Sequence, residues 1–153
     1  EDQIRFGPWL GRWAVSALNS VEHPTWTAVV PIPLHPIRHM QRGYNQLDGF
    51  CRTLARGLGV AYWPQAMRKR TTWALLFGAQ SGRSKRARLK RQINPFFLPP
   101  TTRQKLAGRP GLRILLVDDV VTTGATLRHA LEAWAEIPGV VVDVYTISVG
   151  RDY

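Results

Sequence analysis

The chain has 153 residues, of which 44% are hydrophobic and 20% are charged, a composition typical of one globular domain spanning residues 1–153. No apolar run approaches the roughly 20 residues that cross a bilayer, and no signal-peptide pattern opens the chain, so we expect no membrane insertion. The single cysteine, Cys51, excludes an internal disulfide and a multi-cysteine zinc site, and it favours a reducing, cytoplasmic location.

The net charge of +11 is unevenly placed along the sequence. Between Asp48 and Asp118 there is no acidic residue, whereas that interval holds fifteen Lys and Arg, most densely at residues 83–91. Such a field attracts polyanions, which include pyrophosphate, nucleotides and nucleic acid. The alternative is a solvated helix face, but such a face usually mixes in Glu for i,i+4 pairs, and none occurs here.

Residues 8–19 have the spacing of an amphipathic helix. Trp9, Trp13 and Ala17 recur every four residues, and we expect this stripe to face the core rather than a ligand. A short apolar run at residues 27–32 then predicts a buried strand.

A proline-rich segment follows this strand, at residues 31–46, and its prolines stiffen it. Arg38 and Arg42 lie four positions apart and form a reasonable clamp for phosphate oxygens, although a surface loop with exposed arginines is the alternative. His35 and His39 have the spacing of a metal pair. No acidic or thiol side chain is close to them in the sequence, so we expect no metal site.

The middle of the chain is less regular. Residues 46–58 predict a helix, and residues 60–67 suggest a strand or hairpin. Residues 71–82 have no clean period, residues 84–91 indicate a basic helix, and residues 99–111 are typical of a polar connection.

The most informative stretch is residues 114–126. Four apolar residues predict a strand buried on both faces, and it stops at Asp118 and Asp119. Small and hydroxyl residues follow, and then a helical spacing over residues 127–136. Another apolar run at residues 140–147 predicts a further buried strand. The alternation of strands and helices indicates an α/β fold with a parallel central sheet flanked by helices.

The acidic pair and the loop after it suggest a ligand. A loop of small residues that opens a helix favours a phosphate through free backbone N–H groups and the helix dipole. Two adjacent carboxylates suit a sugar diol or a divalent cation, and a phosphate beside a diol describes a ribose 5-phosphate. The alternative is an ordinary strand–turn–helix whose acids cap the helix, but a cap needs one carboxylate.

Residues 114–126 resemble the phosphoribosyl-pyrophosphate (PRPP) motif of type I phosphoribosyltransferases. The resemblance implies that family's α/β fold, with a small hood and a flexible loop, and it implies Mg²⁺ bound together with PRPP. Asp118 and Asp119 would be the catalytic pair that holds the ribose diol. The residues implied to bind the 5-phosphate are Thr122, Thr123, Gly124, Ala125 and Thr126.

Residues 31–46 resemble the competence protein F (ComF) branch of that family, with Pro-x-Pro-Leu-His followed by Arg-Gly-aromatic-Asn-Gln. This resemblance implies a role in DNA uptake and natural transformation, with single-stranded DNA and the uptake machinery as partners. The residues implied to border the pyrophosphate and the second substrate are Arg38, Arg42, Gly43, Asn45 and Gln46, with Lys69 assisting.

The resemblance also implies a flexible loop that closes over the substrate, with Gln80 in its motif. Arg83 replaces an expected Leu and Arg91 an expected Asn, and both departures add positive charge. Together with Arg86 and Arg88 they strengthen the nucleic-acid interpretation. Thr122 stands where 6-oxopurine enzymes of the family carry an Asp, which disfavours a 6-oxopurine acceptor. The four-cysteine zinc module of many relatives has no counterpart here.

Two functions are therefore predicted. The first is a Mg²⁺-dependent, PRPP-binding phosphoribosyltransferase of the ComF type, which transfers a pentosyl group and is linked to DNA uptake. The second is a non-catalytic protein that binds single-stranded nucleic acid and uses the PRPP fold as a platform or regulatory site. An oligomer is compatible with both.

Overall fold

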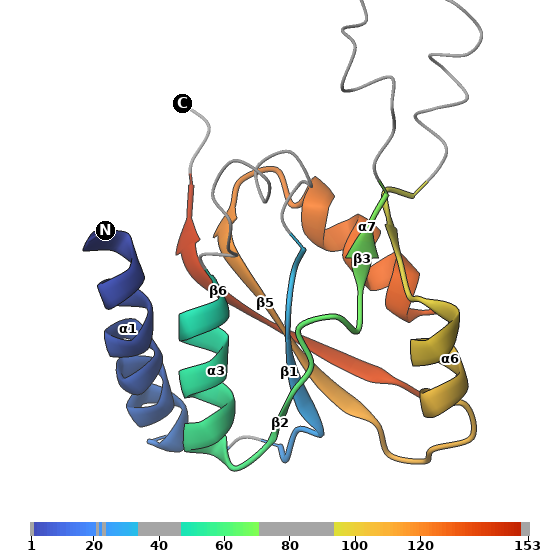
Figure 1. Cartoon of the computed structure of the whole chain (residues 1–153), viewed down its shortest axis with the longest axis horizontal. Helices are drawn as coiled ribbons and strands as arrows, with labels where there is room; N and C mark the ends of the chain where they lie inside the picture. The colour runs from blue at the N-terminus through green and yellow to red at the C-terminus, as the bar shows by residue number, and fades with distance from the viewer. Residues whose placement is uncertain (1, 21, 23, 34–46, 71–93, 151–153) are drawn as a thin grey trace, which may run out of the picture.

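The structure is a computed structural model that describes residues 2–20, 22, 24–33, 47–70 and 94–150. Its centre is a parallel sheet with the strand order β2-β1-β5-β6 (Figure 1). The strands are β1 (Ala28–Pro31), β2 (Ala61–Tyr62), β5 (Arg113–Val121) and β6 (Val141–Val149). The expected α/β class with a parallel sheet is confirmed.

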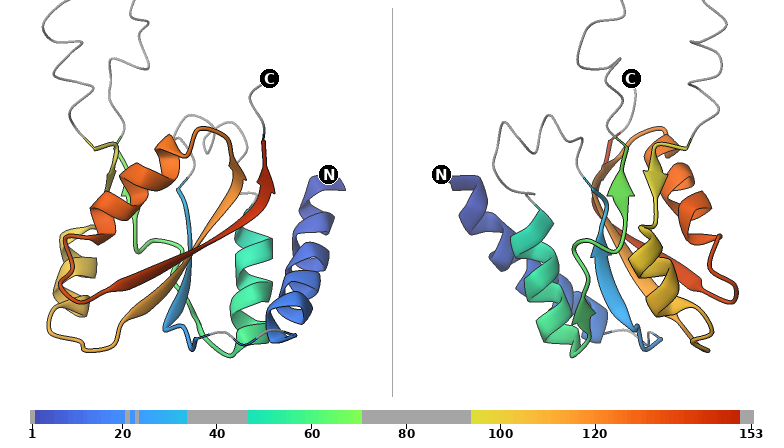
Figure 2. Two further views of the ribbon diagram at one scale, coloured as in Figure 1. Left: turned by 180° about the vertical axis from the view of Figure 1, so that it is seen from behind. Right: turned by 45° about the vertical axis from the view of Figure 1, so that its right-hand side comes forward.

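In the described part of the chain, four helices cover the two faces of this sheet. Helices α1 (Asp2–Asn19) and α3 (Leu47–Leu58) lie on one face, and α6 (Pro100–Leu106) and α7 (Ala125–Trp134) lie on the other (Figure 2). The second face also carries a small antiparallel pair, β3 (Arg68–Lys69) with β4 (Phe96–Phe97).

The hydrophobic core is split by the alternation of side chains along the strands. Val29 and Leu115 pack with α1 and α3, whereas Val30 and Leu116 pack with α6, α7 and the β3–β4 pair. Because strands buried on both faces need apolar residues at every position, the apolar run before Asp118 forms the middle of the sheet. The expected strand at residues 114–117 is thus confirmed as part of β5.

The strand β5 is longer than expected. It continues through the acidic pair to Val121, because β6 extends the ladder as far as the pairing of Val121 with Val149. Asp118 and Asp119 therefore lie within a strand, and they do not cap the following helix. The N-cap of α7 is Gly124, which has no side chain to cap the helix, and the Ala125 N–H donates to the Thr123 hydroxyl oxygen at 3.4 Å.

Two expectations about burial are wrong. Trp9 and Trp13 are 56% and 61% exposed, because α1 packs on α3 through the neighbouring side chains of Leu10, Ala14 and Leu18. The strand β6 is not buried, since it lies at the edge of the sheet and exposes several of its valines.

Residues 99–111 are not merely a polar connection, because they contain α6. Pro100 stands at its first helical position, where proline is favoured because the missing N–H needs no partner. The expected irregular loop at 71–82 and the basic helix at 84–91 lie outside the described residues.

Candidate functional site

The acidic pair lies near the carboxyl end of the central strand β5. Asp118 is 6% exposed and is the one buried charged residue in the described part of the chain. Its Oδ1 accepts a hydrogen bond from the Asp119 backbone N–H at 3.0 Å, and the Asp119 Oδ1 accepts one from the Val120 N–H at 2.8 Å. Each carboxylate is therefore fixed by the backbone that follows it, and oxygen lone pairs remain for a ligand.

Burial and, second to it, the negative charge of Asp119 raise the pKa of Asp118 from 3.8 to about 6, while the positive charge of Lys69 acts in the opposite direction. Ionisation of Asp118 at neutral pH therefore costs free energy. A ligand that brings hydroxyl hydrogens or a cation to this carboxylate would offset that cost. An acidic residue held in this way near a strand end is typical of a functional site.

The loop after β5 turns directly into α7. Gly124 has φ 73°, a left-handed conformation that residues with a Cβ adopt only at a cost, and this allows the helix to begin at Ala125. The first turn of α7 contains no acidic residue, and its backbone N–H groups have no partner within the helix. Residues 120–127, together with Asp118, line a small hollow of about 30 Å³. The combination suits a phosphate-sized anion.

The strand β3 brings a cation to the acidic pair. Lys69 is half-buried, its Nζ lies 5.1 Å from the centre of the Phe96 ring, and its charge lowers the pKa of Asp118. Strands β3 and β4 flank residues 71–93, so the chain enters and leaves that segment close to the site.

Two residues that position the site could not be identified from the sequence alone. Gly150 donates its N–H to the Val121 carbonyl oxygen at 2.8 Å, and a Cβ at this position would approach Cγ2 of Thr122 to 3.0 Å. Asn94 donates to the His129 carbonyl oxygen at 2.7 Å and accepts from the Phe96 N–H at 2.8 Å, which ties β4 to α7. Only the structure reveals these roles, because neither residue stands in a recognisable motif.

The structure brings together part of the expected site. Asp118, Asp119, Lys69 and residues 122–126 lie near one another at the carboxyl end of β5. The remaining expected residues lie outside the described part of the chain: Arg38, Arg42, Gly43, Asn45, Gln46, Gln80, Arg83, Arg86 and Arg88.

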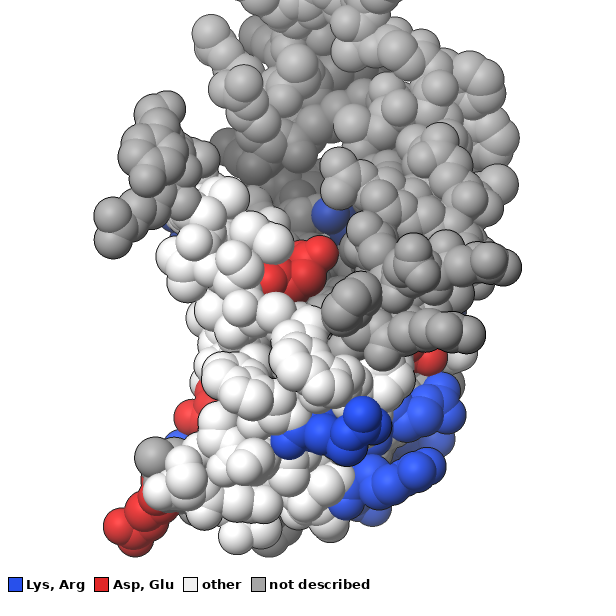
Figure 3. Space-filling model, turned by 90° about the vertical axis from the view of Figure 1, so that its left-hand side faces the viewer, with Lys and Arg blue, Asp and Glu red and all other residues white. Residues whose placement is uncertain are grey.

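Charge is unevenly distributed over the described surface. Seen from the left of Figure 1, Lys and Arg side chains form a group over the end of the molecule where α1 and α3 lie, with an acidic side chain at its edge (Figure 3). The cations of these two helices include Arg12, Arg52 and Arg56, and Arg52 forms an i,i+4 pair with Asp48.

Two searches of the described residues give negative results. No helix there is long and apolar enough to cross a membrane. In the same residues no group of three or more His, Cys, Asp or Glu side chains is arranged to hold a metal ion.

Known proteins resemble this chain both in sequence and in structure, although no family model matches it. The DNA utilization protein YhgH of Salmonella typhi is 33% identical over 86% of this chain and 53% of its own length. Competence protein F of Haemophilus influenzae is 35% identical over 67% of this chain and 41% of its own length. The chain thus spans about half the length of these curated relatives.

Solved structures, a phosphoribosyltransferase among them, share the fold. Adenine phosphoribosyltransferase from Saccharomyces cerevisiae, solved with an imino-altritol bisphosphate and adenine, has a TM-score of 0.50 at 18% identity, covering 96% of this chain and 72% of its own. The allosteric regulatory enzyme of purine biosynthesis has a TM-score of 0.51 at 14% identity, covering 88% of this chain and 24% of its own. The chain is therefore a homologue of competence protein F and YhgH that has the fold of the type I phosphoribosyltransferases.

Proposed function

We propose that this chain binds PRPP with Mg²⁺ and transfers its phosphoribosyl group to an acceptor. The observation that carries the proposal is the placement of a buried carboxylate, Asp118, and its neighbour Asp119 beside the first turn of α7. A diol on the carboxylates and a phosphate on the helix N-terminus are the two ends of a ribose 5-phosphate. The alternative reading of the acids as a helix cap conflicts with their position in β5.

Each part of the proposed site has a separate role. Asp118 and Asp119 accept hydrogen bonds from the two ribose hydroxyls and fix the sugar ring. Residues 122–126 bind the 5-phosphate through backbone N–H groups and threonine hydroxyls. Lys69 helps to stabilise the leaving pyrophosphate, as a fixed positive charge does, together with Arg38 and Arg42 of the proline-rich segment.

The residues present fit a magnesium ion that is bound chiefly through its substrate. Mg²⁺ prefers oxygen ligands and keeps several waters, so two carboxylates near a pyrophosphate suffice, and a closed protein cage is not needed. Such an ion would neutralise the pyrophosphate as it leaves. In the transfer itself the bond from ribose C1 to pyrophosphate breaks, and its electron pair leaves with pyrophosphate. The acceptor bonds to C1, and its proton passes to water or to the departing pyrophosphate.

Calorimetric titration with Mg²⁺-PRPP tests the binding step. We expect binding to the wild-type chain and none to the variant with both Asp118→Ala and Asp119→Ala. Glu22→Ala removes an exposed carboxylate elsewhere and should leave the affinity unchanged. Equal affinity in the double variant and the wild type would refute the proposal. Release of pyrophosphate with a panel of acceptors then tests transfer, and Thr122 leads us to expect no transfer to 6-oxopurines.

A second function is favoured by the names of the relatives and by the charge of the chain. We propose that the chain also binds single-stranded DNA, because its relatives are named for DNA utilization and competence and its net charge is +11. We expect oligonucleotide binding to weaken steeply as the salt concentration rises from about 50 to about 200 mM. Binding that hardly changes with salt would contradict it.

A further inference from the structure

A second pocket lies on the α6 side of the sheet, away from the acidic pair. Its volume is about 700 Å³, and it lies between the segment that follows β2 and the helix α6. We call it the α6 pocket, and its polar and aromatic lining includes Trp63, Gln65, Arg68, Thr102, Lys105 and Arg109. This volume is within the range of sites that hold a nucleotide-sized molecule.

The charge of the α6 pocket is positive and uncompensated. Arg68, Lys105 and Arg109 line it, and no acidic residue is among its described lining residues. Within the described ranges the side chains of Lys105 and Arg109 form no hydrogen bond or ion pair. Arg68 donates to the Gln65 side-chain oxygen at 3.3 Å, a neutral partner that leaves its charge uncompensated. Cations gathered without acidic partners in a concave site attract phosphate groups.

A neighbouring arginine on the same helix shows the contrast. Arg103 forms an ion pair with Glu136 at 2.6 Å and donates to the Leu98 carbonyl oxygen at 3.0 Å, so its charge is used to hold α6 in place. Lys105 has no such role in the described structure. The helix therefore anchors itself through one cation and presents another to the pocket.

Backbone hydrogen bonds fix the part of the α6 pocket that lies next to the sheet. The Trp63 N–H donates to the Val29 carbonyl oxygen at 3.0 Å, and the Ala66 N–H donates to the Trp63 carbonyl oxygen at 3.3 Å. Trp63 is half-buried against the core, and it also lines the pocket. A fixed aromatic side chain beside phosphate-binding cations offers a surface on which a base can stack.

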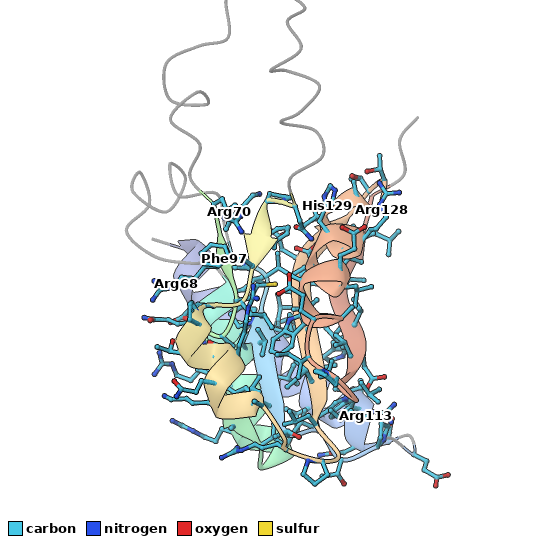
Figure 4. The ribbon with its side chains drawn as sticks, turned by 90° about the vertical axis from the view of Figure 1, so that its right-hand side faces the viewer. Arg68, Arg70, Phe97, Arg113, Arg128 and His129 are labelled. Atoms are coloured by element: carbon cyan, nitrogen blue, oxygen red, sulfur yellow. The ribbon has the colours of Figure 1, made fainter. Side chains whose placement is uncertain are left out.

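A line of cations continues from this pocket along β3. Successive side chains in an extended strand point to opposite sides, so Arg68 and Arg70 are exposed while Lys69 is half-buried near Asp118. Arg70 lies 4.9 Å from the centre of the Phe97 ring. Figure 4 shows Arg68, Phe97 and Arg70 on the same side as α6, one above another.

We propose that the α6 pocket and this line of cations bind consecutive nucleotides of single-stranded DNA. Phosphates would contact Lys105, Arg109, Arg68 and Arg70, and a base would stack on Trp63. This inference rests on the second proposed function and gives it a location. Arg70 immediately precedes segment 71–93 in the sequence, and that segment contains the densest run of basic residues in the chain.

The α6 pocket is separate from the proposed PRPP site, whereas Arg68 and Arg70 flank Lys69 in the sequence. The α6 pocket lies beside β2, which pairs with Ala28 and Val29 at the start of β1, whereas Asp118 follows Val117, the partner of Pro31 at the end of β1. In Figures 1 and 2 the helix α6 lies toward the bottom of the molecule and the start of α7 toward the top. Changes in one site can therefore be tested without removing the other.

The test is fluorescence anisotropy with a labelled oligo(dT) over a range of salt concentrations. The variant with Lys105→Glu and Arg109→Glu is compared with one carrying Arg12→Glu and Arg56→Glu. The control makes the same change in net charge on the groove between α1 and α3. We expect the α6 variant to bind at least about tenfold more weakly, with a salt slope smaller by about 1.4 for two lost phosphate contacts, and the control to change little.

Other outcomes would overturn the proposal in distinguishable ways. Equal weakening in both variants would mean that overall charge, and not this pocket, attracts the DNA. Absence of oligo(dT) binding to the wild-type chain would reject both the pocket proposal and the second function, while Mg²⁺-PRPP binding remains a separate measurement. Circular dichroism of each variant establishes that it is folded.

A parallel titration with dTMP distinguishes a free nucleotide from a DNA strand as the ligand of the α6 pocket. If dTMP binds with an affinity that depends on Lys105 and Arg109, while oligo(dT) binding does not, the pocket takes free nucleotides and the DNA proposal fails. Displacement of oligo(dT) by dTMP only at far higher concentration supports it, because a strand contacts several cations at once. Unchanged Mg²⁺-PRPP binding in the α6 variant is expected in either case.

Discussion

Asp118 accepts a hydrogen bond from the Asp119 backbone N–H at 3.0 Å. The two carboxyl groups therefore lie close together near the carboxyl end of β5. Burial of Asp118 and the charge of Asp119 both oppose its ionisation, and they raise its pKa to about 6. Two close carboxyl groups cost the folded protein free energy at neutral pH. Such a cost is typical of a functional site, where a bound ligand offsets it.

The substitution Asp118→Asn should therefore stabilise the protein while it removes ligand binding. The folded-state pKa is above the unfolded-state value, so stability falls as pH rises from about 4 to about 6, and Asn escapes this loss. We expect a gain on the order of 1–3 kcal/mol at pH 7 and almost none near pH 4. Asn also keeps the acceptor for the Asp119 N–H.

Urea denaturation at several pH values measures this gain. Asp119→Asn is the matched comparison. We expect it to raise the free energy of unfolding by less, because Asp119 is half-buried and its charge is only the second cause of the raised pKa of Asp118. A wild-type protein that is more stable than Asp118→Asn at pH 7 would contradict the account.

Mg²⁺-PRPP affinity should weaken as pH falls below about 6, because the proposed diol contact needs the ionised carboxylate. One proton taken up gives a slope approaching tenfold per pH unit. The phosphate groups of PRPP also titrate near pH 6. The pH slope of Mg²⁺-PRPP affinity for the wild-type chain is therefore compared with the pH slope of phosphate affinity for Asp118→Asn. Identical pH slopes for the two would exclude Asp118 as the titrating group.

Gly124→Ala should destabilise the loop that leads into α7. Its φ of 73° costs a residue with a Cβ about 1–2 kcal/mol, although no atom lies within 4 Å of the added methyl group. Gly124→Asn should lose less, since Asn tolerates this conformation better. Thermal denaturation ranks the three proteins, and equal stability of Ala and Gly at this position would show that the conformation carries no strain.

Gly150→Ala should weaken phosphate-dependent binding without a comparable loss of stability. The added Cβ would lie 3.0 Å from the Thr122 side chain and would displace the loop that contains it. The backbone of Gly150 is not in the left-handed region, so alanine causes no conformational strain there. We expect roughly a tenfold loss of Mg²⁺-PRPP affinity, since small displacements of positioning groups have effects of this size or more. Gly49→Ala, where the new Cβ makes an ordinary contact at 3.4 Å with Pro8, should leave the affinity unchanged.

Asp143→Asn should lower the melting temperature at neutral pH. Asp143 accepts hydrogen bonds from the Trp26 indole at 2.7 Å and from two nitrogens of Arg113 at 2.6 and 3.0 Å, and the Arg113 contact lowers the pKa of Asp143. Its contribution is present above the unfolded pKa and is lost as pH falls through the lower folded pKa. The difference in melting temperature from wild type should therefore shrink in acid, and a constant difference at every pH would contradict this.

Much of the central sheet could be predicted from the sequence, because strands buried on both faces require continuous apolar runs. The helices α3 and α7 follow from their periodicity in the same way, whereas α1 begins at Asp2, six residues before the expected start, and contains Pro8. The exposure of Trp9 and Trp13 could not be predicted, since periodicity identifies a stripe but not the neighbour that covers it. The edge position of β6 likewise depends on strand order, which one strand's composition does not encode.

The acidic pair and the phosphate loop stand out in the sequence because their chemistry is local. The proximity of Lys69 to Asp118, the support that Gly150 gives to Thr122, and the α6 pocket all join segments distant in the chain. Such contacts are set by packing of the sheet and its helices. They become visible only in the folded molecule.

The most direct test of the central claim is a crystal structure of the chain soaked with Mg²⁺ and PRPP. The account predicts electron density for the 5-phosphate at residues 122–126 and for the ribose hydroxyls within hydrogen-bond distance of Asp118 and Asp119. Density for PRPP in the α6 pocket, with the acidic pair free of ligand, would contradict it.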